Sequence, residues 1–323
     1  MLALKASIST ACAVLMLGLG LLATGQPAGA AEVATEHQGL DVLGNLELAG
    51  GKSLKADGVI LLLHDTLAHH RMEVISAQQD ILKEQGVNSL AITLSLGLDK
   101  RRGMYNCTIE QDHRHDDALE EIDTWVAWLK EKGATSITLG GHGRGAAQAA
   151  LYAERKNDKA IRRLVLISPL AQSFDTAEAE YQARYRRPLR EILVQAEKFV
   201  SQDAADELLE GAGFLECPAP KVTAGAFSDY YSASPRFFTP NLMAGVKIPA
   251  LIVVGDQDRS AAEIMAAMQS QPSKNATLAT IPGADHFFSD LFADQLADRI
   301  RDFVKKAPSP AAAPAAQTQA PPG

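Results

Sequence analysis

Short, mostly apolar segments recur along this chain, and segments with helical spacing separate them. The apolar segments are too short for helices, which is typical of strands covered on both faces. They lie at residues 59–63, 90–96, 137–139, 164–167, 251–254 and 276–281. The segment from Met72 to Gln85 has helical spacing and stops at Gly86. Ahead of these segments, Gly50-Gly51 predicts an antiparallel hairpin at the sheet edge, between 46–48 and 53–54. The alternation predicts an α/β fold, a mostly parallel sheet with helices on both faces.

The alternation stops between Pro169 and Pro249. Residues 171–245 are rich in Tyr, Arg and Glu. Helical stretches are expected within this segment near residues 188–200 and 204–209. Because the segment lies between two predicted strands, we interpret it as a cap inserted over the strand ends.

Residues 1–30 carry the pattern of a cleaved signal peptide. Lys5 supplies a positive charge, residues 11–23 form an apolar stretch, and Ala28-Gly29-Ala30 is a small-residue cleavage site. The apolar stretch is shorter than the roughly 20 residues that a transmembrane helix needs. The mature protein is therefore expected to be periplasmic or secreted, with no membrane span.

Residues 307–323 contain seven Ala, five Pro and no charged residue. Such a composition cannot build a core, so a disordered tail is predicted. Residues 31–306 are then expected to form the folded domain. The net charge of −8, with no run of more than three Lys or Arg, argues against nucleic acid as a partner.

Four loops that follow predicted strands carry chemically active side chains. Gly141-His142-Gly143-Arg144-Gly145 lies between a strand and a helix, and His64-Asp65-Thr66 follows the first buried strand. Gly255-Asp256-Gln257-Asp258 and Gly283-Ala284-Asp285-His286 follow two late strands. Ligands of open parallel sheets bind outside the carboxyl ends of the strands, so these loops are expected to meet at one site.

The loop at 141–145 resembles the nucleophile elbow of the α/β-hydrolases, Gly-x-Ser-x-Gly, and residues 58–304 carry the other motifs in the same order. The resemblance implies the α/β-hydrolase fold, with Asp258 and His286 as the acid/base pair and Gly143 at the nucleophile position. It also implies an oxyanion loop formed by His64, Asp65, Thr66, His142 and Arg144. The similarity is closest to exported bacterial members of undefined substrate, whose elbow reads Gly-His-Ser-Arg-Gly.

Two residues differ from that pattern at positions that take part in the reaction. Gly143 has no hydroxyl, so it cannot attack a carbonyl as the serine does. Asp65 places a carboxylate where backbone N–H groups should face a developing oxyanion, which opposes the charge of the transition state. Glycine also tolerates the strained elbow turn without a Cβ penalty. These residues favour a protein without serine-hydrolase activity that binds a small molecule or a protein partner, with no cofactor.

One alternative retains catalysis without a serine. His286, oriented by Asp258, would act as general base on water, which would make the protein an esterase-like hydrolase. Asp65 is also a possible carboxylate nucleophile, although it lies on the loop after residues 59–63 and not on the elbow.

A second alternative is metal binding through histidines that follow strands. Loops at one sheet edge converge, so a zinc or copper site is conceivable. Its ligands would be His64, His69, His113 and His115.

The sequence has three cysteines, and Cys12 belongs to the predicted signal peptide. Cys107 follows the strand at 90–96 and Cys217 lies in the predicted cap, so both belong to the strand-end side. An oxidising compartment would allow them to pair and to clamp cap to core. Two buried free thiols are the alternative.

Overall fold

A computed structural model describes residues 31–306 of the protein. Its centre is an eight-stranded sheet of order β1-β2-β4-β3-β5-β6-β7-β8. The strands are β1 (Ala31–His37), β2 (Leu40–Glu47), β3 (Val59–Leu63), β4 (Ser89–Thr93), β5 (Ile137–His142), β6 (Ile161–Ile167), β7 (Ala250–Gly255) and β8 (Ala276–Ile281). β1 and β2 pair antiparallel, β2 joins β4 antiparallel, and all other pairs are parallel. The predicted α/β class and the mostly parallel sheet are confirmed.

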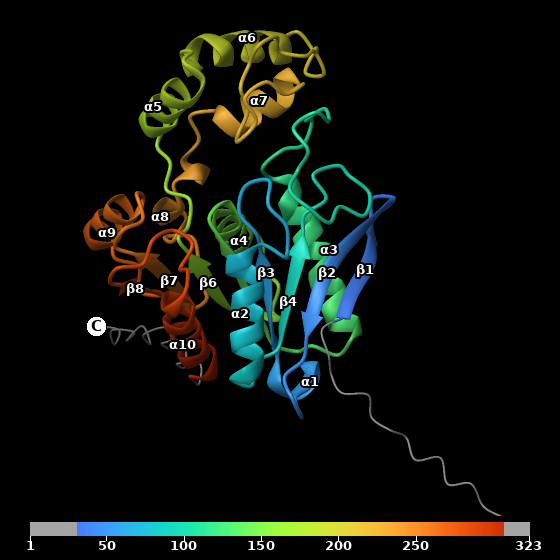
Figure 1. Ribbon diagram of the computed structural model, residues 1–323, viewed down its shortest axis with the longest axis vertical. Helices are drawn as coiled ribbons and strands as arrows, with labels where there is room; N and C mark the ends of the chain where they lie inside the picture. Colours follow the sequence, from blue (N-terminus) through green and yellow to red (C-terminus); the bar gives the residue numbers. More distant parts are fainter. Residues whose placement is uncertain (1–30, 307–323) are drawn as a thin grey trace, which may run out of the picture.

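Helices cover both faces of the sheet, as the alternation predicts (Figure 1). One face packs against α2 (Glu73–Glu84) and α10 (Leu291–Lys305), the other against α3 (Asp117–Glu131), α4 (Arg144–Arg155) and α9 (Ala261–Ser270). Every residue of β3, β4, β5 and β7 is buried, which explains their nearly continuous apolar sequences.

The segment between β6 and β7 forms α5 (Phe174–Tyr185), α6 (Leu189–Ser201), α7 (Ala224–Tyr231), the short 3₁₀ helix η1 (Pro235–Phe237) and α8 (Thr239–Leu242). Helices α5 to α7 stand beyond one end of the sheet, at the top of Figure 1, where the colour changes from yellow-green to gold. We call residues 171–245 the cap. The cap has an apolar cluster of its own around Tyr181, Phe214 and Phe227.

The predicted pairing of Cys107 with Cys217 is confirmed. The two residues form a disulfide with a Cα–Cα distance of 5.4 Å and a sequence separation of 110. Cys217 is fully buried in the apolar cluster of the cap, and Cys107 packs against that cluster from the segment after β4. The bond therefore ties the cap to the core.

Two local predictions are wrong. The edge hairpin turns at Gln38–Gly39, both of which have positive φ, and not at Gly50-Gly51. Residues 54–57 instead form the helix α1, because the Ser53 side chain accepts a hydrogen bond from Ala56 N–H and caps it. No helix forms at 204–209, because Leu208 and Leu209 pair with the segment at Val222–Thr223.

The predicted signal peptide at 1–30 and the predicted tail at 307–323 lie outside the described residues. Within residues 31–306, no helix combines the length and the apolar character needed to cross a membrane.

Candidate functional site

The predicted elbow connects β5 to α4 through Gly143. Gly143 has φ +55° and ψ −118°, a conformation that favours glycine. The turn is tight, since a β-carbon on Gly141 would lie 2.5 Å from the carbonyl carbon of Gly145. Gly143 N–H donates to Ile167 O at 3.0 Å, which anchors the turn to β6. The local backbone is therefore that of a strained strand-to-helix turn, although position 143 offers no nucleophile.

The side chain of Asp65 fills the space beside Gly143. A β-carbon on Gly143 would lie 2.2 Å from Asp65 Cγ, which leaves no room for a serine. Asp65 Oδ1 accepts hydrogen bonds from Arg144 N–H and Thr66 N–H, each at 2.6 Å. Asp65 therefore reaches the elbow from the loop after β3, and its carboxylate occupies the N–H donors of Arg144 in the elbow and Thr66 in its own loop.

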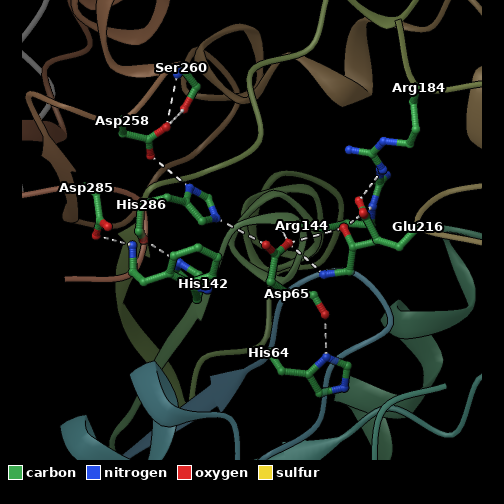
Figure 2. Close-up of polar contacts among 12 residues, drawn as sticks. His64, Asp65, His142, Arg144, Arg184, Glu216, Asp258, Ser260, Asp285 and His286 are labelled. Carbon is green, nitrogen blue, oxygen red and sulfur yellow. Dashed lines mark hydrogen bonds and ion pairs between the residues drawn. The ribbon is translucent and has the colours of Figure 1, made fainter. Parts of the chain in front are cut away.

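His286 lies between two carboxylates (Figure 2). Its Nδ1 is 2.9 Å from Asp258 Oδ2, and its Nε2 is 3.2 Å from Asp65 Oδ2. Asp258 is fixed in turn by Ser260, whose N–H and hydroxyl both donate to Oδ1 at 3.0 Å. Because ionised carboxylates only accept hydrogen bonds, this arrangement suits a doubly protonated imidazolium.

The charges of these three residues stabilise one another. Burial by itself would lower the pKa of His286, but hydrogen bonds to Asp258 and Asp65 and their charges raise it to about 10. Burial would raise the pKa of each carboxyl, but the hydrogen bond from His286 holds both well below the usual range. At neutral pH the three side chains are therefore two carboxylates and one imidazolium.

The other residues of the predicted oxyanion loop support Asp65 and His286. The buried His64 ring contacts Asp65 O through Nδ1 at 2.7 Å and accepts from Leu94 N–H at Nε2 at 3.0 Å. Arg144 Nε donates to Thr66 Oγ1 at 3.1 Å, and His142 Nε2 lies 2.8 Å from the carbonyl oxygen of His286. These side chains hold the loops together.

The four histidines of the alternative metal site do not meet in one place. The predicted ligand set is therefore wrong. His64 braces Asp65, His113 Nδ1 bonds the Tyr230 hydroxyl at 2.9 Å, and the His115 ring packs against Phe237. His69 does not belong to a group of possible metal ligands among the described residues. Within residues 31–306, the one group of three or more possible metal ligands is Asp65, His142 and His286, with ligating atoms within 4.8 Å. Both His286 nitrogens already face carboxylates, so a metal ion there would have to replace a proton.

A cavity of about 240 Å³ opens onto these residues from the cap side. Asp65 and His286 line it from the core, and Tyr181, Arg184 and Glu216 line it from the cap. Arg184 and Glu216 form an ion pair at 2.6 Å (Figure 2). Sequence reasoning did not predict this ion pair, because the two residues lie 32 positions apart in a segment without a motif.

The model of the alpha/beta hydrolase family matches residues 60–299. The chain belongs to the α/β-hydrolase family. This α/β-hydrolase is also similar in fold to solved structures. Est1E from Butyrivibrio proteoclasticus has a TM-score of 0.56 at 21% identity, over 84% of this chain and 96% of that one.

Two further structures show the same fold. The Pyrococcus furiosus esterase Pf2001 has a TM-score of 0.55 at 18% identity, over 86% of this chain and 90% of that one. The alpha/beta hydrolase GrgF from Penicillium has a TM-score of 0.61 at 17% identity, over 86% and 98% of the two chains. No curated protein matches the chain in sequence. At these identities the likeness concerns the fold alone.

Proposed function

We propose that this member of the α/β-hydrolase family lacks serine-hydrolase activity and binds a small molecule beneath its cap. The observation that carries the proposal is the Asp65 carboxylate, which fills the place of a nucleophilic side chain at Gly143. The Pyrococcus furiosus esterase of similar fold suggests ester hydrolysis, but acyl transfer needs groups that are replaced in this chain.

Acyl transfer needs a hydroxyl and free donors for the oxyanion. Gly143 supplies no hydroxyl, and the N–H groups of Arg144 and Thr66 already donate to Asp65. Loss of a single oxyanion donor costs about 10²–10³ in rate, and loss of the nucleophile costs more. Both losses together remove any useful turnover of esters.

The alternative in which His286 acts directly as a general base on water is not favoured. A base needs a lone pair on the nitrogen that faces the substrate, and an imidazolium has none. With a pKa raised to about 10 by its two carboxylate partners, His286 is charged at neutral pH. At neutral pH, His286 can therefore donate a proton but cannot accept one at Nε2.

A binding role is favoured by the cavity that remains. It has about 240 Å³ of space, and both charged side chains and the tyrosines of the cap line it. We further propose a periplasmic or secreted location. The Cys107–Cys217 disulfide supports it, because such bonds persist in oxidising compartments.

The test for the first half of the proposal is labelling by a fluorophosphonate probe and turnover of p-nitrophenyl acetate. Both require an activated hydroxyl, so the wild-type protein should give neither. Ester turnover that persists in the wild type and disappears in His286→Ala would overturn the proposal and support the general-base alternative.

The test for the second half is ligand-observed NMR with a small-molecule fragment panel. Thr176 lines the cavity from α5, so Thr176→Trp should fill it and abolish binding. Ala179→Trp introduces the same side chain at an exposed position of the same helix and should leave binding unchanged. Equal binding by wild type and Thr176→Trp would place the ligand elsewhere.

A further inference from the structure

Three side chains from different strand ends bring possible metal-ligating atoms together beside the elbow. Asp65 follows β3, His142 is the last residue of β5, and His286 lies in the loop after β8 (Figure 2). Each offers one ligand atom, and these atoms all lie within 4.8 Å of one another. Two imidazoles and one carboxylate are a ligand set that zinc uses in sites that keep a coordination position open.

We propose that Asp65, His142 and His286 bind a zinc ion whose remaining coordination position opens onto the cavity. The side chains of Asp65 and His286 line that cavity and are 27% and 29% exposed, whereas His142 is buried. The ion enters from the cavity, and its open position takes a water molecule or an acidic group of a ligand. The inference goes beyond the proposed small-molecule binding and does not depend on it.

The spacing of Asp65 and His286 fits a shared ion. Zinc holds imidazole nitrogens and carboxylate oxygens at about 2.0–2.2 Å, so two ligand atoms on a tetrahedral ion lie about 3.4 Å apart. Asp65 Oδ2 and His286 Nε2 are separated by 3.2 Å. An ion can therefore replace the hydrogen that these two atoms share with almost no change in their separation. Since the whole group lies within 4.8 Å, His142 has to approach by about 1.4 Å at most.

The two histidines already have the partners that ligating histidines have in zinc sites. There, the second ring nitrogen donates to a carboxylate or to a backbone carbonyl. His286 Nδ1 is 2.9 Å from Asp258 Oδ2, and His142 Nε2 is 2.8 Å from the carbonyl oxygen of His286. Because a carbonyl oxygen only accepts, His142 Nε2 carries the hydrogen and Nδ1 keeps its lone pair for the ion.

The carboxylate of Asp65 is oriented in a similar way. Its Oδ1 accepts from the N–H groups of Arg144 and Thr66, each at 2.6 Å, whereas Oδ2 faces His286. One oxygen is thus fixed by the backbone, and the other is directed to the place of the ion. With zinc in place of the proton on His286 Nε2, the two positive charges of the ion balance the carboxylates of Asp65 and Asp258.

A zinc site also connects the two departures from the hydrolase pattern. A β-carbon on Gly143 would lie 2.2 Å from Asp65 Cγ, so a serine there would push Asp65 away from His286. Glycine at the elbow is therefore required for the carboxylate to reach the histidines. Loss of the nucleophile and gain of a metal ligand are then parts of one change.

The test is zinc binding by untagged mature protein that has been stripped with EDTA and is titrated at pH 8. Isothermal titration calorimetry should find one zinc ion per chain with micromolar or tighter affinity. Asp258→Asn should weaken binding by about 10–100-fold, because it removes only the partner that orients His286. His142→Gln removes a ligand and should weaken binding further. His69→Gln is the matched control and should bind as wild type does, since His69 lies in the same loop as Asp65 but outside the ligand group.

Two measurements on wild-type protein serve if His142→Gln does not fold. X-ray absorption of the zinc-loaded protein should show two imidazole ligands. Bound Co²⁺ should give the visible absorption of a four- or five-coordinate ion, and acetohydroxamate, a chelating anion, should shift these bands because a position is open.

Three results would overturn the inference and leave the small-molecule proposal standing. They are absence of zinc binding by the wild type, equal affinity in wild type and His142→Gln, and fewer than two imidazoles on the bound zinc. Cobalt bands that acetohydroxamate does not change would overturn the open coordination position.

Discussion

Asp65 and Gly143 lie side by side because the strands that precede them are paired. Leu63 of β3 is the register partner of Gly141 of β5, and each of the two residues lies two positions further along its strand direction. A β-carbon at position 143 would therefore meet Asp65 Cγ at 2.2 Å. The elbow and the loop after β3 cannot both carry a side chain directed into this space, so the two positions are coupled.

The coupling predicts that only a double change restores a serine-hydrolase site. Gly143→Ser combined with Asp65→Gly should allow labelling by a fluorophosphonate probe. The new hydroxyl would find His286 Nε2 free of its second carboxylate, and the donors on Arg144 and Thr66 would be open. Gel fluorescence after labelling measures the effect, and adding His286→Gln to the double variant should remove the label.

Neither single change should suffice. Gly143→Ser alone meets the Asp65 carboxylate, and Asp65→Gly alone has no nucleophile. The serine also adopts φ +55°, so the strain of about 1–3 kcal/mol should lower the melting temperature of the single variant. Asp65→Gly should recover part of that loss. Strong labelling of Gly143→Ser alone would show that the two positions are independent.

Much of the fold could be predicted from the sequence. Short apolar segments such as 59–63 and 251–254 that alternate with helical segments are typical of buried strands in a parallel sheet, so few folds are compatible with them. The Asp258–His286 pair could be placed because the loops after two late strands carry Asp and His in the order that the resemblance to α/β-hydrolases implies. The prediction was wrong where a short-range hydrogen bond decides the structure. One example is the side chain of Ser53, which accepts a hydrogen bond at the amino terminus of the helix at residues 54–57.

The resemblance placed Asp65 near the oxyanion site, but its contact with His286 and its position against Gly143 could not be predicted, because they depend on which strands are neighbours. The sequence places β4 between β3 and β5, whereas the sheet places β3 directly beside β5. Only that pairing brings the loop after β3 to the elbow. The ion pair between Arg184 and Glu216 in the cap could not be predicted either, because it depends on how α5 packs against a later loop.

The disulfide should contribute measurably to stability. The bond closes a loop of 110 residues between core and cap, and Cys217 is fully buried. The double variant Cys107→Ser/Cys217→Ser should lose about 2–4 kcal/mol in the free energy of unfolding, measured by urea titration. Thiol titration of denatured, unreduced mature protein should find no free thiol, and detection of two free thiols would disprove the bond in the exported protein.

Truncation after Lys306 should leave stability unchanged. The described residues end at Lys306, whose carbonyl oxygen accepts a hydrogen bond from the Arg163 guanidinium. Truncation after Asp302 is the matched control, because it removes Phe303 and Val304, which pack against the apolar core. Thermal unfolding should show a loss of several degrees for the control alone. A comparable loss after removal of residues 307–323 would make the tail part of the fold.

Mass spectrometry of the mature protein should also find that residues 1–30 are absent. The cleavage pattern at Ala28-Gly29-Ala30 places the new amino terminus close to Ala31, where β1 begins. An intact mass that includes these residues in a periplasmic extract would contradict the predicted signal peptide.

The charge state of His286 should make stability depend on pH with a defined sign. Its pKa is raised in the folded protein from 6.5 to about 10, so the folded state binds the proton more tightly than the unfolded state. The stabilisation is therefore complete below about pH 6.5, decreases as the pH rises and is lost above about pH 10. The pKa values of Asp65 and Asp258 are lowered, so their contribution is present above about pH 4 and is lost in acid.

Urea titrations at pH 6 and pH 9.5 test this sign. Wild-type protein should lose free energy of unfolding between the two values, and His286→Gln should lose much less, because glutamine does not titrate. Asp65→Asn should give an intermediate loss, since it removes one of the two carboxylates that hold the proton. NMR titration of the His286 ring should show a lower pKa in that variant than in the wild type. An equal loss of stability in wild type and His286→Gln would mean that folding does not raise the pKa of His286, and the imidazolium held between two carboxylates would have to be abandoned.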